Sequence, residues 1–307
     1  MLVTNAAPHG DKLQALLGNA KLPSSDKGRV AAAVVRYSEW VTRLRAAPGT
    51  GDALLSYLVA QLNDYKRYIE LDLIFDAEDD FLYRQKGQLK LDNTILEEFL
   101  PYLFDIRLVP GLGRLPNLTC GPQSSFAGLS FASPFMPLSA GGVLIKLKDQ
   151  DFSVSKSHNI AITDGTTPTD TFQMSFVVSH FATEIKTNLD KTMFQEASQT
   201  AAELKRAVPG SRYILLCEFL DMTPITTKLT SIDEVIVLRK AKRLASNIRA
   251  EFATTTGRKR ARGAYVEYLD RNPLQKVCFE RFVQHLNDCF PEKEEDAEDV
   301  VLGRGYF

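Results

Sequence analysis

The sequence predicts a mixed α/β fold, in which a central sheet flanked by helices follows a helical N-terminal region. Before about residue 105, apolar residues recur at helical spacing. After residue 142, runs of β-branched and aromatic residues alternate with helical stretches. Prolines and glycines between residues 109 and 140 predict an irregular connection between these two parts. We therefore expect a helical region over 1–125 and a sheet-containing core over 126–307.

Three helices are expected in the N-terminal region. Ser24 to Asp26 supply N-cap chemistry before apolar residues that share one helix face, and Pro48-Gly49 ends this first helix. Apolar residues at the same spacing predict the other two helices, at Asp52–Tyr68 and Asn93–Phe104.

The C-terminal part alternates between the two kinds of element. Short apolar or alternating segments predict strands, and longer stretches with one apolar face predict helices. The expected strands are Val143–Leu147, Asp151–Ser155, Phe172–Thr187 and Arg212–Phe219, and the expected helices are Leu189–Ala207, Ile232–Phe252 and Leu274–Leu286.

Charge is distributed unevenly along a chain of 307 residues whose formal net charge is only -1. The stretch from Arg239 to Arg262 has nine Lys or Arg and one acid, whereas Glu292 to Asp299 forms an acidic tail. Two solvated charge runs are the default interpretation, since exposed charges are common. The asymmetry also fits a basic face for a polyanion.

Several classes of protein are disfavoured. The four cysteines include no CxxC pair, which argues against a disulfide scaffold and a zinc site. The N-terminus has no charged segment followed by an apolar one, as a signal peptide would have. No apolar run approaches the ~20 residues that span a bilayer. We expect a cytoplasmic protein without a membrane partner.

Glu184 and Lys186 are the first candidates for catalysis. In the expected strand they share one face, and Thr183 and Ile185 point into the core on the other. A carboxylate and an ammonium at a largely apolar strand are costly unless each has a partner, and Mg²⁺ is such a partner for a carboxylate. A Glu-x-Lys tripeptide alone is a weak signal, because most such pairs are surface ion pairs.

A metal site needs a second carboxylate, and three aspartates are available. Asp149 and Asp151 lie at the turn between two expected strands, and Asp151 precedes Glu184 by 33 residues (184 − 151). Asp170 precedes it by 14 (184 − 170) and follows a turn. Each of the three also fits ordinary turn chemistry, because aspartate bonds its own backbone there.

Four segments resemble the Bpu10I family of restriction endonucleases, which includes the heterodimeric enzyme BbvCI. The most characteristic segment is TEIKTNLDKTMFQEA at Thr183–Ala197. The others are KDQDF at Lys148–Phe152, YILLCEFLDMTP at Tyr213–Pro224 and NPLQKVCFERF at Asn272–Phe282. Together they cover roughly the C-terminal half, and the N-terminal half offers no comparable match.

The resemblance implies a restriction-endonuclease-like mixed sheet with a PD-(D/E)XK active site. Glu184 and Lys186 match the Glu and Lys of that motif, and Asp151 fits its leading Asp although Gln150 stands where the motif has Pro. The implied catalytic residues are Asp151, Glu184 and Lys186, with Asp151 and Glu184 as the Mg²⁺ ligands. The implied activity is cleavage of double-stranded DNA at a short specific site by one subunit of a pair.

The implied nuclease activity favours DNA contact for the basic stretch, because Lys and Arg supply most non-specific affinity for phosphates. Thr254 to Arg262 is expected to form a flexible basic loop. The partner subunit is either a second related chain or a second copy. The candidate DNA-binding residues are Arg239, Lys240, Lys242, Arg243, Arg258, Lys259, Arg260 and Arg262.

Overall fold

The N-terminal part of the computed structural model is helical, as expected. The structure describes residues 2–3, 6–131, 142–164, 167–292 and 297–305. The helix α3 (Gly51–Arg67) continues directly into a π-helical segment, Tyr68–Phe75. The helices of this part are α1 (Pro8–Leu17), α2 (Ser24–Arg45), α3 (Gly51–Arg67), α4 (Phe81–Gln85) and α5 (Thr94–Phe99), followed by 3₁₀ turns at Leu100–Leu103 and Pro110–Arg114.

One mixed sheet organises the remainder. In the described part of the chain its strand order is β1-β2-β3-β4-β5-β6. The pairs β2–β3 and β3–β4 are antiparallel, and β4–β5 and β5–β6 are parallel. The strands are β1 (Leu2–Val3), β2 (Thr119–Phe131), β3 (Val143–Asp164), β4 (Thr167–Leu189), β5 (Arg212–Leu220) and β6 (Glu234–Lys242).

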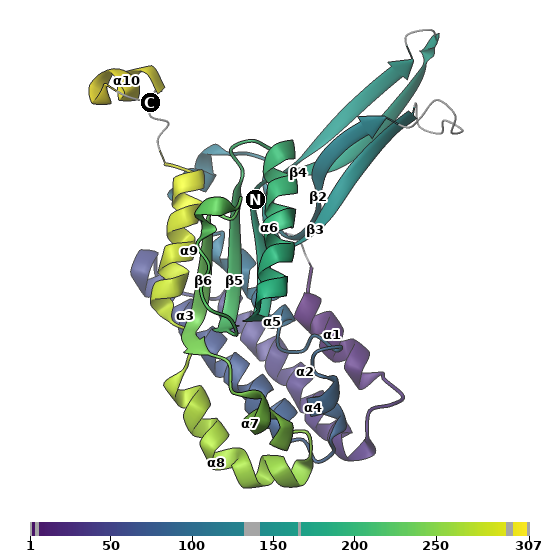
Figure 1. The fold of residues 1–307 in the computed structure, drawn as a ribbon, viewed down its shortest axis with the longest axis vertical. Coiled ribbons are helices and arrows are strands. Elements are labelled where there is room, and N and C mark those ends of the chain that lie inside the picture. Colours follow the sequence, from purple (N-terminus) through teal and green to yellow (C-terminus); the bar gives the residue numbers. More distant parts are fainter. Residues whose placement is uncertain (1, 4–5, 132–141, 165–166, 293–296, 306–307) are drawn as a thin grey trace.

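Helices cover both faces of this sheet (Figure 1). The helix α6 (Lys191–Ala207) packs with Ala182, Tyr213 and Leu215 on one face. The other face packs against the N-terminal helices and α9 (Lys276–Cys289). The remaining helical segments are a 3₁₀ turn at Thr227–Leu229, α7 (Ser246–Glu251), α8 (Thr255–Arg271) and α10 (Ala297–Arg304). No helix in the described residues has the length and apolarity that a membrane span requires.

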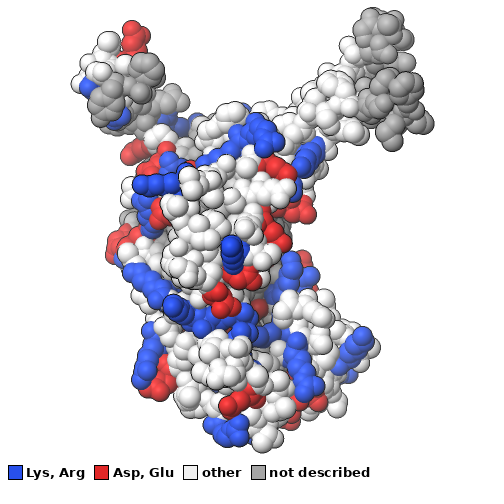
Figure 2. Space-filling view, viewed as in Figure 1, with Lys and Arg blue, Asp and Glu red and all other residues white. Residues whose placement is uncertain are grey.

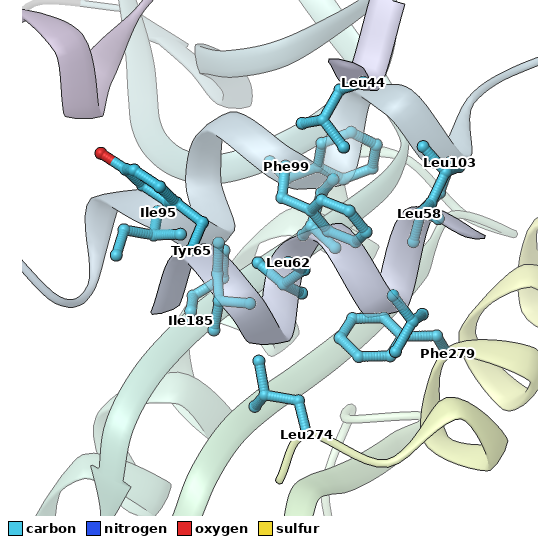
Figure 3. Close-up of a cluster of buried hydrophobic side chains, with 14 of the residues drawn as sticks. Leu44, Leu58, Leu62, Tyr65, Ile95, Phe99, Leu103, Ile185, Leu274 and Phe279 are labelled. Carbon is cyan, nitrogen blue, oxygen red and sulfur yellow. The ribbon is translucent and has the colours of Figure 1, made fainter. Parts of the chain in front are cut away.

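A single hydrophobic cluster joins the helical region and the sheet, which the sequence pattern had placed in separate regions. Figure 3 shows Leu62 of α3, Phe99 of α5, Ile185 of β4 and Phe279 of α9 converging. The boundary expected after residue 125 falls inside β2. The helical region and the sheet therefore share one core.

Strands β2, β3 and β4 extend beyond the body as an arm (Figure 1). The sequence predicted two short strands, Val143–Leu147 and Asp151–Ser155, separated by a turn, but β3 runs through both without a turn and has 22 residues. The strand expected at Phe172–Thr187 extends at both ends in β4, which has 23 residues. In the arm, the rings of Phe126 and Phe176 lie 4.9 Å apart and bridge two strands. Polar residues such as Asn159 and Ser175 interrupt the apolar pattern, which made the distal strand difficult to predict.

Two further predictions are corrected. The expected helix at Ile232–Phe252 is β6 followed by the short α7, because Leu215 and Cys217 pair with Val235 and Val237 in parallel. The expected basic loop at 254–262 belongs mostly to α8. The acidic tail falls partly outside the described residues, at 293–296.

Candidate active site

The site is built on β4, where the side chains of alternate residues serve different purposes. Ile185 is 1% exposed and enters the main core, which directs its neighbours Glu184 and Lys186 to the other side of the strand. Their side chains are 18% and 28% exposed. Thr183 is fully buried, as predicted. The strand thus presents a partly desolvated carboxylate and ammonium together.

Glu184 is held from two sides. Lys186 Nζ lies 2.7 Å from Glu184 Oε1, and the Tyr213 hydroxyl on β5 donates to Glu184 Oε2 at 2.7 Å. Burial and the Glu184 charge raise the pKa of Tyr213, so the phenol keeps the proton that it donates. Tyr213 lies in the strand expected at Arg212–Phe219, and its contact with Glu184 depends on the pairing of β4 with β5.

Lys186 is an ammonium in this arrangement. Burial lowers its pKa, but the hydrogen bond and the charge of Glu184 raise it by more, so the net shift is upward. Asp151 and Glu196 also raise the pKa. Lys186 is therefore suited to orienting a nucleophile or balancing negative charge.

Asp151 lies beside this pair on β3. Its Oδ2 accepts a 2.7 Å hydrogen bond from the backbone N–H of Ile185, which joins the carboxylate to the strand that carries Glu184. Burial is the largest cause of its raised pKa, and the Glu184 charge adds to it. The structure therefore brings together Asp151, Glu184 and Lys186.

Asp149 and Asp170 were the other two candidates for the second carboxylate. Asp149 is exposed, and its side chain accepts a hydrogen bond from Ser124 on β2. Asp170 belongs to the stretch 164–170, whose side chains lie outside the described part of the structure. The observed geometry supports Asp151 as the second carboxylate.

One residue before β2 contacts the same site, and the pKa of a second is affected by the charge there. Asn93 Nδ2 donates to the Ile185 carbonyl at 3.4 Å, and the Thr187 hydroxyl donates to Asn93 Oδ1 at 3.3 Å. Glu97 on α5 is 7% exposed, and its pKa is raised to about 7 by burial and then by Asp151. Sequence reasoning missed both residues. The only signal for Glu97 was a carboxylate within an apolar helical stripe.

The model of the Bpu10I restriction endonuclease family matches residues 88–307, which is well over half of the chain. The chain belongs to this family. Among solved structures, it is similar to one described as the native BbvCI A2B2 tetramer at low resolution. That likeness has a TM-score of 0.52 and 20% identity, and it covers 78% of this chain and 86% of the other. It shows a shared fold. No curated protein matches.

The matched family region contains all of Asp151, Glu184, Lys186 and Glu97. Within the described residues, no group of three or more His, Cys, Asp or Glu side chains is arranged to hold a metal ion. Mg²⁺ typically uses one or two protein carboxylates and completes its coordination with water and phosphate. The pair Asp151 and Glu184 therefore fits Mg²⁺ and does not fit a cation that needs a complete protein cage.

Two of the expected DNA-binding residues are interior residues, which corrects their prediction. Arg239 is 4% exposed and ion-paired with Glu70 and Glu218. Arg258 is 1% exposed and donates to carbonyls that include those of Phe75 and Phe252. Neither guanidinium faces solvent, so neither is placed to contact DNA phosphate.

The other basic residues of this stretch lie at the surface. Figure 2 shows a band of Lys and Arg side chains across the molecule, at the level where β6 leads into α7. Arg243 is ion-paired with Asp221, Arg260 with Glu251, and Arg262 with Asp76. Three exposed lysines have no described ion pair, namely Lys240, Lys242 and Lys259.

Helix α6 begins at Lys191, two residues after the expected start at Leu189. Its N-cap is Asp190, whose carboxylate accepts from the Met193 N–H at 2.8 Å. Gln195 and Glu196 are exposed, and Glu196 acts on Lys186 only through its charge. His180 is partly buried, and burial lowers its pKa.

Proposed function

We propose that this chain is a subunit of a Mg²⁺-dependent type II restriction endonuclease that hydrolyses double-stranded DNA at a short specific site. One observation carries the proposal. Asp151, Glu184 and Lys186 meet on adjacent strands, partly desolvated, within a chain of a restriction endonuclease family. A desolvated charge cluster of this kind is costly to the fold and is typical of functional sites.

Each side chain has a distinct role in the proposal. Asp151 and Glu184 hold the cation, which when bound polarises the scissile phosphate and acidifies a water molecule. Lys186 orients the attacking water and balances the negative charge that develops on the phosphoryl oxygens. Tyr213 fixes the direction of the Glu184 carboxylate through its hydrogen bond. The products are 5′-phosphate and 3′-hydroxyl ends.

The proposed DNA surface consists of the exposed lysines Lys240, Lys242 and Lys259, with Arg243, Arg260 and Arg262 beside them. These cations supply sequence-independent affinity for phosphates. Arg243, Arg260 and Arg262 must first exchange their carboxylate partners for phosphate. The proposed location of the protein is the cytoplasm, where it meets cellular DNA.

A second subunit completes the proposed enzyme. The similar solved structure is described as an A2B2 tetramer, which contains two kinds of chain. One active site cuts one strand, so a double-strand break needs two sites. We expect a related but different partner chain, and the alternative is a second copy of this one.

The test is plasmid cleavage with Mg²⁺ by the purified chain, alone and mixed with the product of any related neighbouring gene. Glu184→Gln is the matched variant, because it keeps the size and the acceptor for Tyr213 but removes the charge. Site-specific cuts or nicks that disappear in this variant support the proposal. Intact plasmid in every mixture, with DNA still bound, contradicts it and favours a non-catalytic DNA-binding subunit.

Nicking without sequence preference has a different meaning. It favours a repair-type nuclease on the same fold. Mapping the cut positions on two unrelated plasmids separates these outcomes, because a restriction enzyme cuts both at one shared motif.

A further inference from the structure

A cavity of about 320 Å³ lies where β4 and β5 end, between the sheet and the helices α4, α7 and α8 (Figure 1). Tyr83 of α4, Phe252 directly after α7 and Tyr265 of α8 supply aromatic walls, and Asn188 of β4 lines the cavity on the side of the sheet. Small-molecule sites have volumes of about 300–1,000 Å³, so this cavity has room for one compact ligand.

The cavity lies close to the candidate active site. Asn188 follows Lys186 by two residues on the same strand, which places it about 7 Å farther along β4. Thr187, which also lines the cavity, donates to Asn93, and Asn93 donates to the Ile185 carbonyl. A ligand in the cavity therefore borders the strand that carries the catalytic candidates.

Three polar side chains at the cavity lack a charged or hydrogen-bonding partner. Lys86 Nζ lies 4.8 Å from the centre of the Tyr83 ring, and Arg249 Nε donates to the Leu244 carbonyl. Neither cation forms an ion pair with the described residues, and the half-buried amide of Asn188 makes no hydrogen bond with them. The cavity thus offers two positive charges and an amide that both donates and accepts.

The two acids of the cavity wall already have cations of their own. Glu70 is ion-paired with Arg239 and Lys66, and the charge of Asp92 raises the pKa of Lys66. The charges of Lys86 and Arg249 are therefore in excess, which favours an anionic ligand. The aromatic walls favour a flat ring, and the amide of Asn188 favours a ring with polar edges.

We propose that this cavity binds one unpaired nucleotide, with its base against the aromatic wall and Asn188 and its phosphate on Lys86 and Arg249. Aromatic walls combined with cations are the means by which proteins hold single-stranded nucleic acid. Two sources share this chemistry, namely a nucleotide extruded from the DNA duplex and a free mononucleotide. The first source rests on the proposed function, and the second does not.

The experiment is equilibrium binding to the intact chain in EDTA, where no Mg²⁺ supports cleavage. The probes are a duplex with one unpaired 2-aminopurine nucleotide, the same duplex fully paired, and 2-aminopurine riboside 5′-monophosphate. Gly87→Trp is the blocking variant, because Gly87 lines the cavity and a Cβ there meets no atom within 4 Å. Gly28→Trp on α2 is the matched control, because its surroundings are equally open and lie outside the cavity.

We expect the duplex with the unpaired nucleotide to bind about tenfold more tightly than the paired duplex, with quenching of the 2-aminopurine emission by the aromatic wall. Gly87→Trp should abolish the preference and the quenching, and Gly28→Trp should abolish neither. Both variants should unfold at the wild-type temperature. Lys86→Ala is a second variant, which leaves the cavity open and should reduce the preference. Quenching of the mononucleotide alone, lost in Gly87→Trp, would support the site and identify a free nucleotide as its ligand.

Equal binding of the two duplexes, without quenching of the mononucleotide, would overturn the inference and leave the proposed function intact. A preference that both Gly87→Trp and Lys86→Ala retain would also overturn it. Failure to bind either duplex would count against the proposed function, and the mononucleotide would then decide the inference alone.

Discussion

At the scale of a single residue, Tyr213 makes the most direct test of how the site is held. Its hydroxyl is the only described donor to Glu184 Oε2, on the opposite side from Lys186. Tyr213→Phe removes this hydrogen bond and nothing else of size. A hydrogen bond to a charged group contributes about 1.5–3 kcal/mol, so we expect DNA cleavage to slow by about 10- to 160-fold.

The matched control is Tyr268→Phe, which removes a hydrogen bond to the Lys242 carbonyl, outside the active site. Single-turnover cleavage rates at saturating Mg²⁺ compare the two variants. An equal loss of rate in both would assign the effect of Tyr213 to general stability.

Glu97 gives a prediction for pH dependence. Its pKa in the folded state is about 7, above the usual 4.5, because of burial and Asp151. The folded state therefore binds the proton more tightly, and stability falls as pH rises from about 4.5 to 7. Glu97→Gln removes this loss. We therefore expect the variant, relative to the wild type, to gain on the order of 2 kcal/mol more in unfolding free energy at pH 8 than at pH 5. Urea unfolding with EDTA measures the difference, and a gain independent of pH contradicts it.

The sequence predicted part of the site at this scale. Glu184 and Lys186 lie two apart on one strand, so alternation alone placed them together. Asp151 needed the resemblance, because several aspartates fitted a turn. Tyr213 contacts Glu184 only through the pairing of β4 with β5, and no local pattern records such a contact.

At the scale of elements, the basic stretch shows where local pattern and tertiary context diverge. The segment of β6 has alternating and helical apolar spacing at once, and a short apolar run does not decide between them. The segment forms a strand because it pairs with β5 and is buried beside it. The start of α8 is set by Thr254, whose hydroxyl accepts from the Gly257 N–H. A side chain at Gly257 would lie 1.8 Å from the Glu251 carbonyl, so glycine is required there.

The buried ion pairs between β6 and the N-terminal helices predict a stability effect. Arg239 pairs with Glu70 of the π-helical segment and with Glu218 of β5, which also contacts Lys66. Arg239→Ala leaves two buried carboxylates with one cation. We expect a loss of about 3–5 kcal/mol in unfolding free energy, measured by denaturant titration. Exposed Lys242→Ala is the control and should change stability by less than about 0.5 kcal/mol.

At the scale of the whole molecule, one hydrophobic core spans both the helical region and the sheet-containing core. The cluster in Figure 3 draws residues from α2, α3, α5, β4 and α9, so the active strand is supported by the N-terminal helices. The sequence identified the helices and the mixed sheet. It did not identify the shared core, because packing between distant segments has no local signature.

DNA contacts are expected on the surface of the basic stretch, outside the shared core. Removing charge from that surface should therefore weaken DNA binding without affecting the fold. The triple variant Lys240→Ala, Lys242→Ala and Lys259→Ala tests this. Each lost phosphate contact reduces the slope of log K against log salt by about 0.9, so the triple variant should lose up to about 3. Fluorescence anisotropy with a duplex at several salt concentrations measures this slope.

The control for the same surface is Lys191→Ala, an exposed lysine at the start of α6 and outside the basic stretch. Added to the wild type or to the triple variant, this substitution should leave the slope unchanged. Because these lysines contact phosphates in our proposal, the triple variant should weaken binding to all duplexes alike. A slope equal to that of the wild type would place DNA on another face of the molecule.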